Sequence, residues 1–349
     1  MEYLIAHGPG NPRNSEGSFI KLKNNDIMYI YTRYIGNDWH DHCSADICSI
    51  RSTDGGKSWS EPKIVVPFQG LNVMSVTLLR LQNGRILLKY SRKLDIPGYP
   101  KHKECRPTLI FSDDECESWS EPVDVANMPA VYMVCNNDRI IQLKSGRIVI
   151  PVSHHSYCTN ATLGAGVVKF FLSDDDGATW RTACDYCYPK NYMHLGFMEP
   201  GLIELSDGRL MCWMRTRVGC QYKCFSYDQG EHWTEPIPAP EFPSQDSPLS
   251  MKRNPENNAL YAIWNDYHPT RSVRFEPGVM GRTPLVMAKS FDEGTSWVEH
   301  IALEDSPRHG FAYTAMLFDG NKLFLAYCCG GLDTCECMLQ DVKIRIIDL

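Results

Sequence analysis

One turn-sized pattern, Ser-x-Asp-x-Gly-x-x-Trp, recurs along this 349-residue chain and constrains its architecture more than any single residue does. The first residues of successive copies lie 60, 61, 53 and 64 positions apart. We expect a tandem array, because a unit of about sixty residues buries too little apolar surface to fold alone. The five copies are STDGGKSW (52–59), SDDECESW (112–119), SDDDGATW (173–180), SYDQGEHW (226–233) and SFDEGTSW (290–297).

The residue types of this pattern are those of a stapled turn rather than of an active site. Ser and Asp side chains form hydrogen bonds with nearby backbone groups, glycine supplies a positive φ, and Trp anchors the turn through its apolar face. A repeated feature is a poor candidate for a unique catalytic site. The second copy carries Cys116 in the glycine position, so we expect that turn to be the most strained.

A second repeat places a polar pair such as Asn-Gly, Ser-Gly or Asp-Gly between two apolar runs, which is the strongest short-range signal for a β-hairpin. Six such hairpins predict an all-β fold, a six-bladed β-propeller built as a single domain over residues 1–349. The runner-up is an open β-solenoid, which needs shorter and more regular repeats. The last residues, 342–349, are expected to form a strand that closes the ring against the N-terminal segment. The six segments are 22–31, 81–90, 143–152, 205–214, 254–263 and 317–327.

Composition excludes several classes of function. The net charge is -7 and no basic run is present, so nucleic acid is not an expected partner. No apolar stretch is long enough to span a membrane, and the first ten residues lack the features of a signal peptide, so we expect a cytoplasmic protein without a membrane partner. The fifteen cysteines lack zinc-site spacing and the histidines form no metal-binding motif, so reduced thiols and no metal or cofactor are expected.

The five boxes, known as Asp boxes or BNR repeats, together with the six hairpins make the chain resemble the sialidase (neuraminidase) superfamily over essentially its whole length. The most specific match is EPGLIELSDGRLMCWMR at 199–215. By that resemblance Glu199 is the base that activates the nucleophile, and Arg215 is one of three arginines that bind the substrate carboxylate. The segment AYTAML at 312–317 places Tyr313 where the family has its nucleophile.

The resemblance extends to further positions. Arg13 resembles the first carboxylate-binding arginine, although the usual Arg-Ile-Pro is replaced by Arg-Asn-Ser, and Arg282 resembles the third. Arg33 matches an additional active-site arginine of the family. Asp41 resembles the acid/base residue, with Asp46 as its competitor.

Two polar residues at strand ends have no counterpart in this resemblance. Arg106 and Asp138 are candidates to line the same face of the propeller and bind the sugar, or they are hairpin-turn residues.

The chemistry of the matched residues suits an acidic sugar substrate. Arginine binds a carboxylate through two parallel hydrogen bonds and stays protonated at any working pH. A neutral Tyr avoids the repulsion that a carboxylate nucleophile would meet, and it needs a base because its ordinary pKa is about 10. We therefore expect an exo-glycosidase that releases a terminal acidic sugar, an α-linked sialic acid, with retention. Another acidic sugar, a lyase on the same scaffold, and a propeller that binds glycans or proteins without catalysis stay open.

Overall fold

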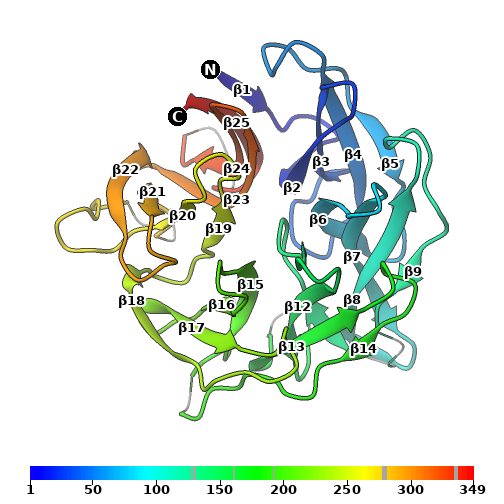
Figure 1. Ribbon diagram of the computed structural model, residues 1–349. Helices are drawn as coiled ribbons and strands as arrows, with labels where there is room; N and C mark the ends of the chain where they lie inside the picture. Colours follow the sequence, from blue (N-terminus) through cyan, green and yellow to red (C-terminus); the bar gives the residue numbers. More distant parts are fainter. Residues whose placement is uncertain (127, 129–130, 160–161, 192, 277–280, 334–336) are drawn as a thin grey trace.

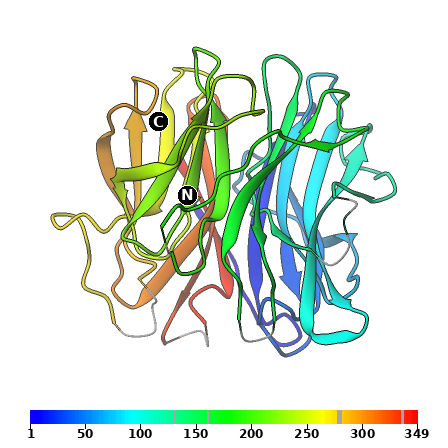
Figure 2. The same cartoon turned by 90° about the horizontal axis from the view of Figure 1, so that it is seen from below.

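The computed structural model describes residues 1–349 except 127, 129–130, 160–161, 192, 277–280 and 334–336. Strands and turns make up the described part of the chain, which contains no helix. The sheets lie around a common centre in Figure 1, and the side view in Figure 2 shows their strands running from one face of the ring to the other. The predicted all-β class is confirmed.

Four of the sheets have four antiparallel strands each. The last one takes β1 from the N-terminus, which pairs with β25 in the register Glu2↔Arg345 to Ile5↔Val342, as expected for ring closure. The strands are β2 (Asn14–Lys21), β3 (Ile27–Tyr34), β4 (Ala45–Ser52) and β5 (Lys63–Val66); β15 (Met198–Glu204), β16 (Leu210–Arg215), β17 (Cys220–Ser226) and β18 (Ile237–Pro243); β19 (Ser250–Arg253), β20 (Leu260–Asn265), β21 (Leu285–Ser290) and β22 (Val298–Glu304); and β1 (Glu2–Ile5), β25 (Asp341–Asp348), β24 (Lys322–Gly331) and β23 (His309–Asp319).

The fifth sheet has nine strands, so the described residues form five sheets rather than the six that six hairpins suggested. Two antiparallel runs join in it because β10 pairs in parallel with β8 through Tyr132 and Cys105. The strands are β6 (Asn72–Arg80), β7 (Ile86–Ile96), β8 (Tyr99–Ser112), β9 (Val123–Asp124), β10 (Tyr132–Val134), β11 (Ile141–Gln142), β12 (Ile148–His155), β13 (Gly166–Ser173) and β14 (Arg181–Thr182).

The hydrophobic core is divided into clusters that lie between neighbouring runs of strands. One such cluster packs the apolar residues of β2, β3 and β4 against β6, β7 and β8. Another packs Leu87 and Phe111 against Ile148 and Phe171, and so separates the two halves of the nine-stranded sheet. Because each run buries its faces against its neighbours, no run is stable by itself.

Each repeated box begins at the last residue of a long strand and forms the turn that follows it. In the fifth copy the Ser290 hydroxyl donates to Asp292 at 2.8 Å and accepts from the Gly294 amide at 2.8 Å. The expected stapled turn is therefore present. In the second copy Cys116 takes the position of the glycine and has a φ of 70°, a left-handed conformation that a side chain disfavours.

Candidate active site

A pocket of about 380 Å³ lies where the central strands β2, β6, β15 and β23 approach one another. Its volume is in the range of sites that bind small molecules. Six of the residues singled out from the sequence line it, although they are up to 300 positions apart in the chain. They are Arg13, Asp41, Glu199, Arg215, Arg282 and Tyr313.

Tyr313, Glu199 and Arg215 form a connected group in this pocket. The Tyr313 hydroxyl donates to Oε1 of Glu199 at 3.1 Å, and Nη1 of Arg215 donates to the same oxygen at 2.6 Å. Arg215 also donates from Nε to Asp246 at 2.8 Å. The Glu199 and Arg215 side chains are each about a tenth exposed, and Tyr313 is half-buried. The carboxylate is therefore held by two donors in a water-poor site.

The other two arginines differ in how their donors are used. Arg13 donates to Asp41 at 2.6 Å, to the Trp39 carbonyl at 3.2 Å and to Ser15 at 3.1 Å. Arg282 is 4% exposed, and its buried Nε and Nη1 have no hydrogen-bond partner in the described structure. Its guanidinium lies 5.3 Å from the centre of the Tyr313 ring. Arg282 therefore keeps donor capacity beside the pocket that no described residue uses.

The charges of this group shift several pKa values. Burial raises the pKa of Tyr313 above its ordinary value and the charge of Glu199 raises it further, while Arg282 and Arg215 oppose the increase. Desolvation works to raise the pKa of Asp41, but the charges of Arg13 and Lys93 and the hydrogen bond from Arg13 hold it well below its usual range. Asp41 lines the pocket, and its side chain is 61% exposed to solvent.

Three other residues proposed from the sequence do not line the pocket. Arg33 on β3 pairs in register with Asp46, and its charge acts on Tyr31 and Cys48. Arg106 donates to Glu104 and, at 3.2 Å, to the Ala126 carbonyl, so its hydrogen bonds join β8 to the segment that follows β9.

The third of them, Asp138, accepts from Ser18 and Lys252 at 3.0 Å and from the Met316 amide at 3.1 Å, and so ties three sheets together. Asp46, the alternative acid/base, accepts from the Phe68 amide at 2.7 Å and is also absent from the pocket lining. Of the two candidate carboxylates, the pocket contains Asp41.

Sequence reasoning missed several polar residues that line the pocket, among them Glu16, Ser75 and Lys93. A positional signal existed for two of them. Glu16 and Ser75 each lie six residues before the leucine that opens their hairpin segment, as Glu199 does in its own segment. Aligning the hairpin segments would have marked these two positions as counterparts of Glu199.

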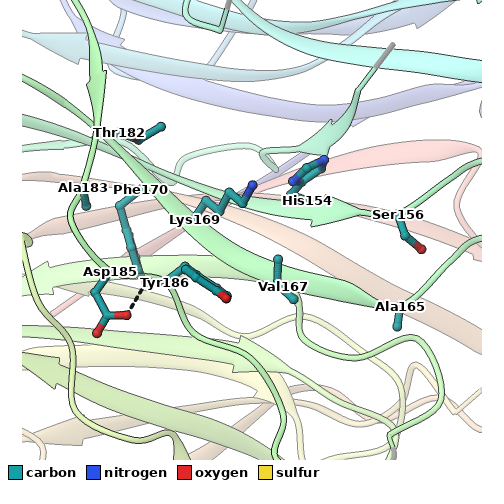
Figure 3. Close-up of a pocket in the computed structure, with 10 residues that line it drawn as sticks. All are labelled: His154, Ser156, Ala165, Val167, Lys169, Phe170, Thr182, Ala183, Asp185 and Tyr186. Atoms are coloured by element: carbon teal, nitrogen blue, oxygen red, sulfur yellow. Dashed lines mark hydrogen bonds between the residues drawn. The ribbon is translucent and has the colours of Figure 1, made fainter. Parts of the chain in front are cut away.

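A second pocket, of about 500 Å³, is lined by residues of β12, β13 and β14 and of the segments next to them (Figure 3), and it shares no lining residue with the first. His154, Lys169 and Tyr186 line it, and the Tyr186 amide donates to Asp185 at 2.8 Å. Burial, and secondarily the charge of Lys169, lowers the pKa of His154 to about 4. Among the described residues that line this second pocket, no hydrogen bond joins a base to a nucleophile, so the first pocket is the candidate active site despite its smaller volume.

The described residues contain no group of three or more His, Cys, Asp or Glu side chains arranged to hold a metal ion. No helix among them is long and apolar enough to cross a membrane. The cysteines within the described ranges are free thiols, and most of them are buried.

Comparison with known proteins places this architecture in a family. Residues 45–325 match the BNR repeat-like domain. The chain is 23% identical over 320 residues to a sialidase of Bacteroides fragilis (strain YCH46), covering 80% of this chain and 53% of the relative. It is also 23% identical over 341 residues to a sialidase of Clostridium perfringens, covering 89% of this chain and 85% of the relative. The chain thus spans about half the length of the first relative and most of the second.

Solved structures have the same fold at low identity. A leech intramolecular trans-sialidase bound to 2,7-anhydro-Neu5Ac superimposes with a TM-score of 0.74 and 15% identity, over 99% of this chain and 69% of that one. A protein of unknown function from Dyadobacter fermentans DSM 18053 gives a TM-score of 0.77 and 17% identity, over 100% and 98% of the two chains. Because the repeats, the fold and the family match agree, this chain belongs to the BNR repeat-like family of the sialidase superfamily.

Proposed function

We propose that this protein is a retaining exo-glycosidase that releases a terminal α-linked sialic acid. One observation carries the proposal: the Tyr313 hydroxyl donates to Glu199 at 3.1 Å in a pocket that also contains Arg13, Arg215 and Arg282. A nucleophile within hydrogen-bond reach of a base, beside several fixed cations, suits attack on an anionic sugar. The sialidases among its relatives support the same class of substrate.

The three arginines bind the substrate carboxylate in this proposal. Arg282 contributes two buried N–H groups that have no partner among the described residues. Arg13 exchanges its bond to Asp41 for one to the substrate. Arg215 stays fixed by Glu199 and Asp246, and adds its charge. Converging guanidinium groups orient the sugar and select it over neutral sugars.

In the first chemical step the Tyr313 oxygen forms a bond to the anomeric carbon while the bond to the leaving oxygen breaks. Glu199 takes the phenolic proton, which is necessary because burial raises the pKa of Tyr313. Asp41 gives its proton to the leaving oxygen. For that it must be protonated, and loss of the ion pair with Arg13 on substrate binding raises its pKa toward the working range.

In the second step Asp41 takes a proton from water, the water oxygen attacks the anomeric carbon, and the bond to Tyr313 breaks. The proton held by Glu199 returns to the Tyr313 oxygen. Two displacements at one carbon give net retention of configuration.

We also propose that the ring has six blades. The nine-stranded sheet contains two antiparallel runs, and a hydrophobic cluster lies between them as between other neighbouring blades. A single parallel pair, Tyr132 with Cys105, joins the two runs.

The test is release of a fluorogenic leaving group from an α-linked N-acetylneuraminic acid by the native chain and by Tyr313→Phe. We expect the substitution to lower kcat by at least about 10²-fold, because it removes the nucleophile. Tyr90→Phe is the matched control, since Tyr90 is a buried phenol without a hydrogen-bond partner in the described structure and is absent from the pocket lining. Full activity of Tyr313→Phe would exclude the covalent step.

NMR of the first product separates the remaining alternatives. Free sugar of retained configuration supports the proposal, and the inverted sugar excludes it. A 2,7-anhydro sugar, the ligand named for the leech relative, would point to an intramolecular transfer. An unsaturated product would indicate a lyase. Absence of any product from sialosides and uronosides would favour a propeller that binds glycans without cleaving them.

A further inference from the structure

Four central strands carry the same irregularity at the pocket. In each, the pairing register shifts at a non-glycine residue with a positive φ: Glu16 at 32°, Ser75 at 62°, Glu199 at 47° and Tyr313 at 61°. All four residues line the pocket. Bulges and left-handed residues of this kind cost free energy and concentrate at functional sites, where they redirect a side chain. The proposed function uses Glu199 and Tyr313, and leaves Glu16 and Ser75 without a role.

Glu16 is a buried carboxylate whose two oxygens have different surroundings. Its side chain is 4% exposed. Oε2 accepts from the Ser75 hydroxyl and, at 3.3 Å, from the amide of Asn136. Oε1 lies 4.0 Å from Nη2 of Arg13. Both hydrogen-bond donors therefore bind Oε2. Oε1 is the carboxylate oxygen near Arg13, and it remains available to a ligand in the pocket.

The hydrogen bonds of Arg13 do not require Glu16, although the charge of Glu16 also acts on the buried Lys89 and Arg139. The donors of Arg13 are directed to Asp41, to the Trp39 carbonyl and to Ser15, so Arg13 is fixed without Glu16. Burial raises the pKa of Glu16, as do the charges of Asp41 and Glu199, against the opposing effects of Ser75 and Arg13. A carboxylate kept in an unfavourable place, on a strained backbone and with one oxygen open, is suited to a ligand.

We propose that Glu16 is a specificity-determining residue whose Oε1 accepts a hydrogen bond from a hydroxyl or amide N–H group of the acidic sugar while Arg13 binds the sugar carboxylate. Ser75 and Asn136 position Glu16 by holding Oε2. This inference rests on the proposed function and narrows its substrate class to sugars that carry one carboxylate with a neutral donor nearby. A site built to accept from a substrate donor rejects analogues that lack the donor, because its own polar atom is then left unpaired.

The experiment compares native protein with Glu16→Gln on an α-linked N-acetylneuraminic acid substrate and on analogues that each lack one ring hydroxyl or the amide. We expect the native protein to lose about 10- to 100-fold in kcat/KM on one analogue, as for a hydrogen bond to a charged group. Glu16→Gln should lose a similar factor on the parent substrate, mainly through KM, and should treat that analogue and the parent within about 3-fold of each other.

Glu115→Gln is the control, because this carboxylate accepts from Arg80 and Lys23 outside the pocket; it should keep the native preference. If Glu16→Gln and the native protein discriminate equally between the parent substrate and the analogue, the inference is overturned. If the native protein is inactive on the parent substrate and on every analogue, the proposed function is overturned instead. If Glu16→Gln does not fold, Ser75→Ala carries the test. Ser75→Ala keeps the carboxylate but removes one of the two donors that hold Oε2, so discrimination should fall by about 3- to 10-fold. Unchanged discrimination would again overturn the inference.

Discussion

Replacing Arg282 by Met should stabilise the fold while removing ligand binding. Arg282 is 4% exposed, and its Nε and Nη1 have no hydrogen-bond partner within the described structure. A buried charge with unpaired donors destabilises the folded state unless a ligand satisfies it. Arg215 is the contrasting case, because its guanidinium donates to Glu199 and Asp246.

The magnitude follows from the contacts. Two unpaired buried donors cost about 2 to 6 kcal/mol in the free energy of unfolding, at about 1 to 3 kcal/mol each. Loss of the cation–π contact with Tyr313, 5.3 Å from the ring centre, offsets about 0.5 to 2 kcal/mol. Met fills most of the vacated space, so Arg282→Met should gain about 1 to 4 kcal/mol. For a chain of 349 residues this raises Tm by about 1.5 to 6 °C.

Calorimetric unfolding with and without a carboxylate-bearing analogue, 2-deoxy-2,3-didehydro-N-acetylneuraminic acid, measures both effects. The analogue should raise the Tm of the native protein and leave that of Arg282→Met unchanged. Arg215→Met is the matched control and should lose about 3 to 5 kcal/mol, because it leaves two carboxylates without their partner. An equal loss of stability in both variants would refute the argument that Arg282 is unpaired.

Two predictions concern stability alone. Ser290→Ala should lower the free energy of unfolding in urea by about 1 to 3 kcal/mol, because the buried Gly294 amide loses its acceptor. The control, Ser296→Ala at an exposed position, should cost less, and equal losses in the two variants would contradict this reasoning. Hydrogen bonds from Arg253 lower the pKa of Glu293 to about 2. The contribution of Glu293 to the stability of the fold is therefore present above about pH 4.5 and is lost as the pH falls toward 2. The Tm of the native protein should fall over that pH range, and the Tm of Glu293→Gln should fall less steeply. An identical slope of Tm against pH in the two proteins would contradict the assignment.

Patterns of neighbouring residues were sufficient to predict the strands and turns of this protein. The boxes and hairpin segments predicted where strands end, because turn chemistry is decided by neighbouring residues. Ser52, Ser112, Ser173, Ser226 and Ser290 each end a strand, as the repeats required. The number of separate sheets was not decided locally, since the contact of Tyr132 with Cys105 joins two runs across 27 positions.

Arg33 shows where sequence reasoning stopped, because the resemblance assigned both it and Arg13 to the active site and only Arg13 lines the pocket. Arg13 lies just before β2, whereas Arg33 lies on β3, where successive side chains point to opposite faces. Thr32 accepts from the Ser75 amide on the side of β6, whereas Arg33 pairs with Asp46 and acts on Tyr31 and Cys48. Spacing along the chain could not reveal which face would meet the pocket.

The sequence by itself determined the repeats, the all-β class, the turns and, through family resemblance, six residues that the pocket contains. Only the tertiary structure decided that Glu16 and Ser75 join them, that Arg106 and Asp138 stand apart, and that Arg282 keeps unpaired donors. The reason is physical: turn formation depends on residues a few positions apart, whereas the pocket forms only when the ring closes and brings Arg13 and Tyr313 into one lining. Contacts of that range depend on how whole sheets pack.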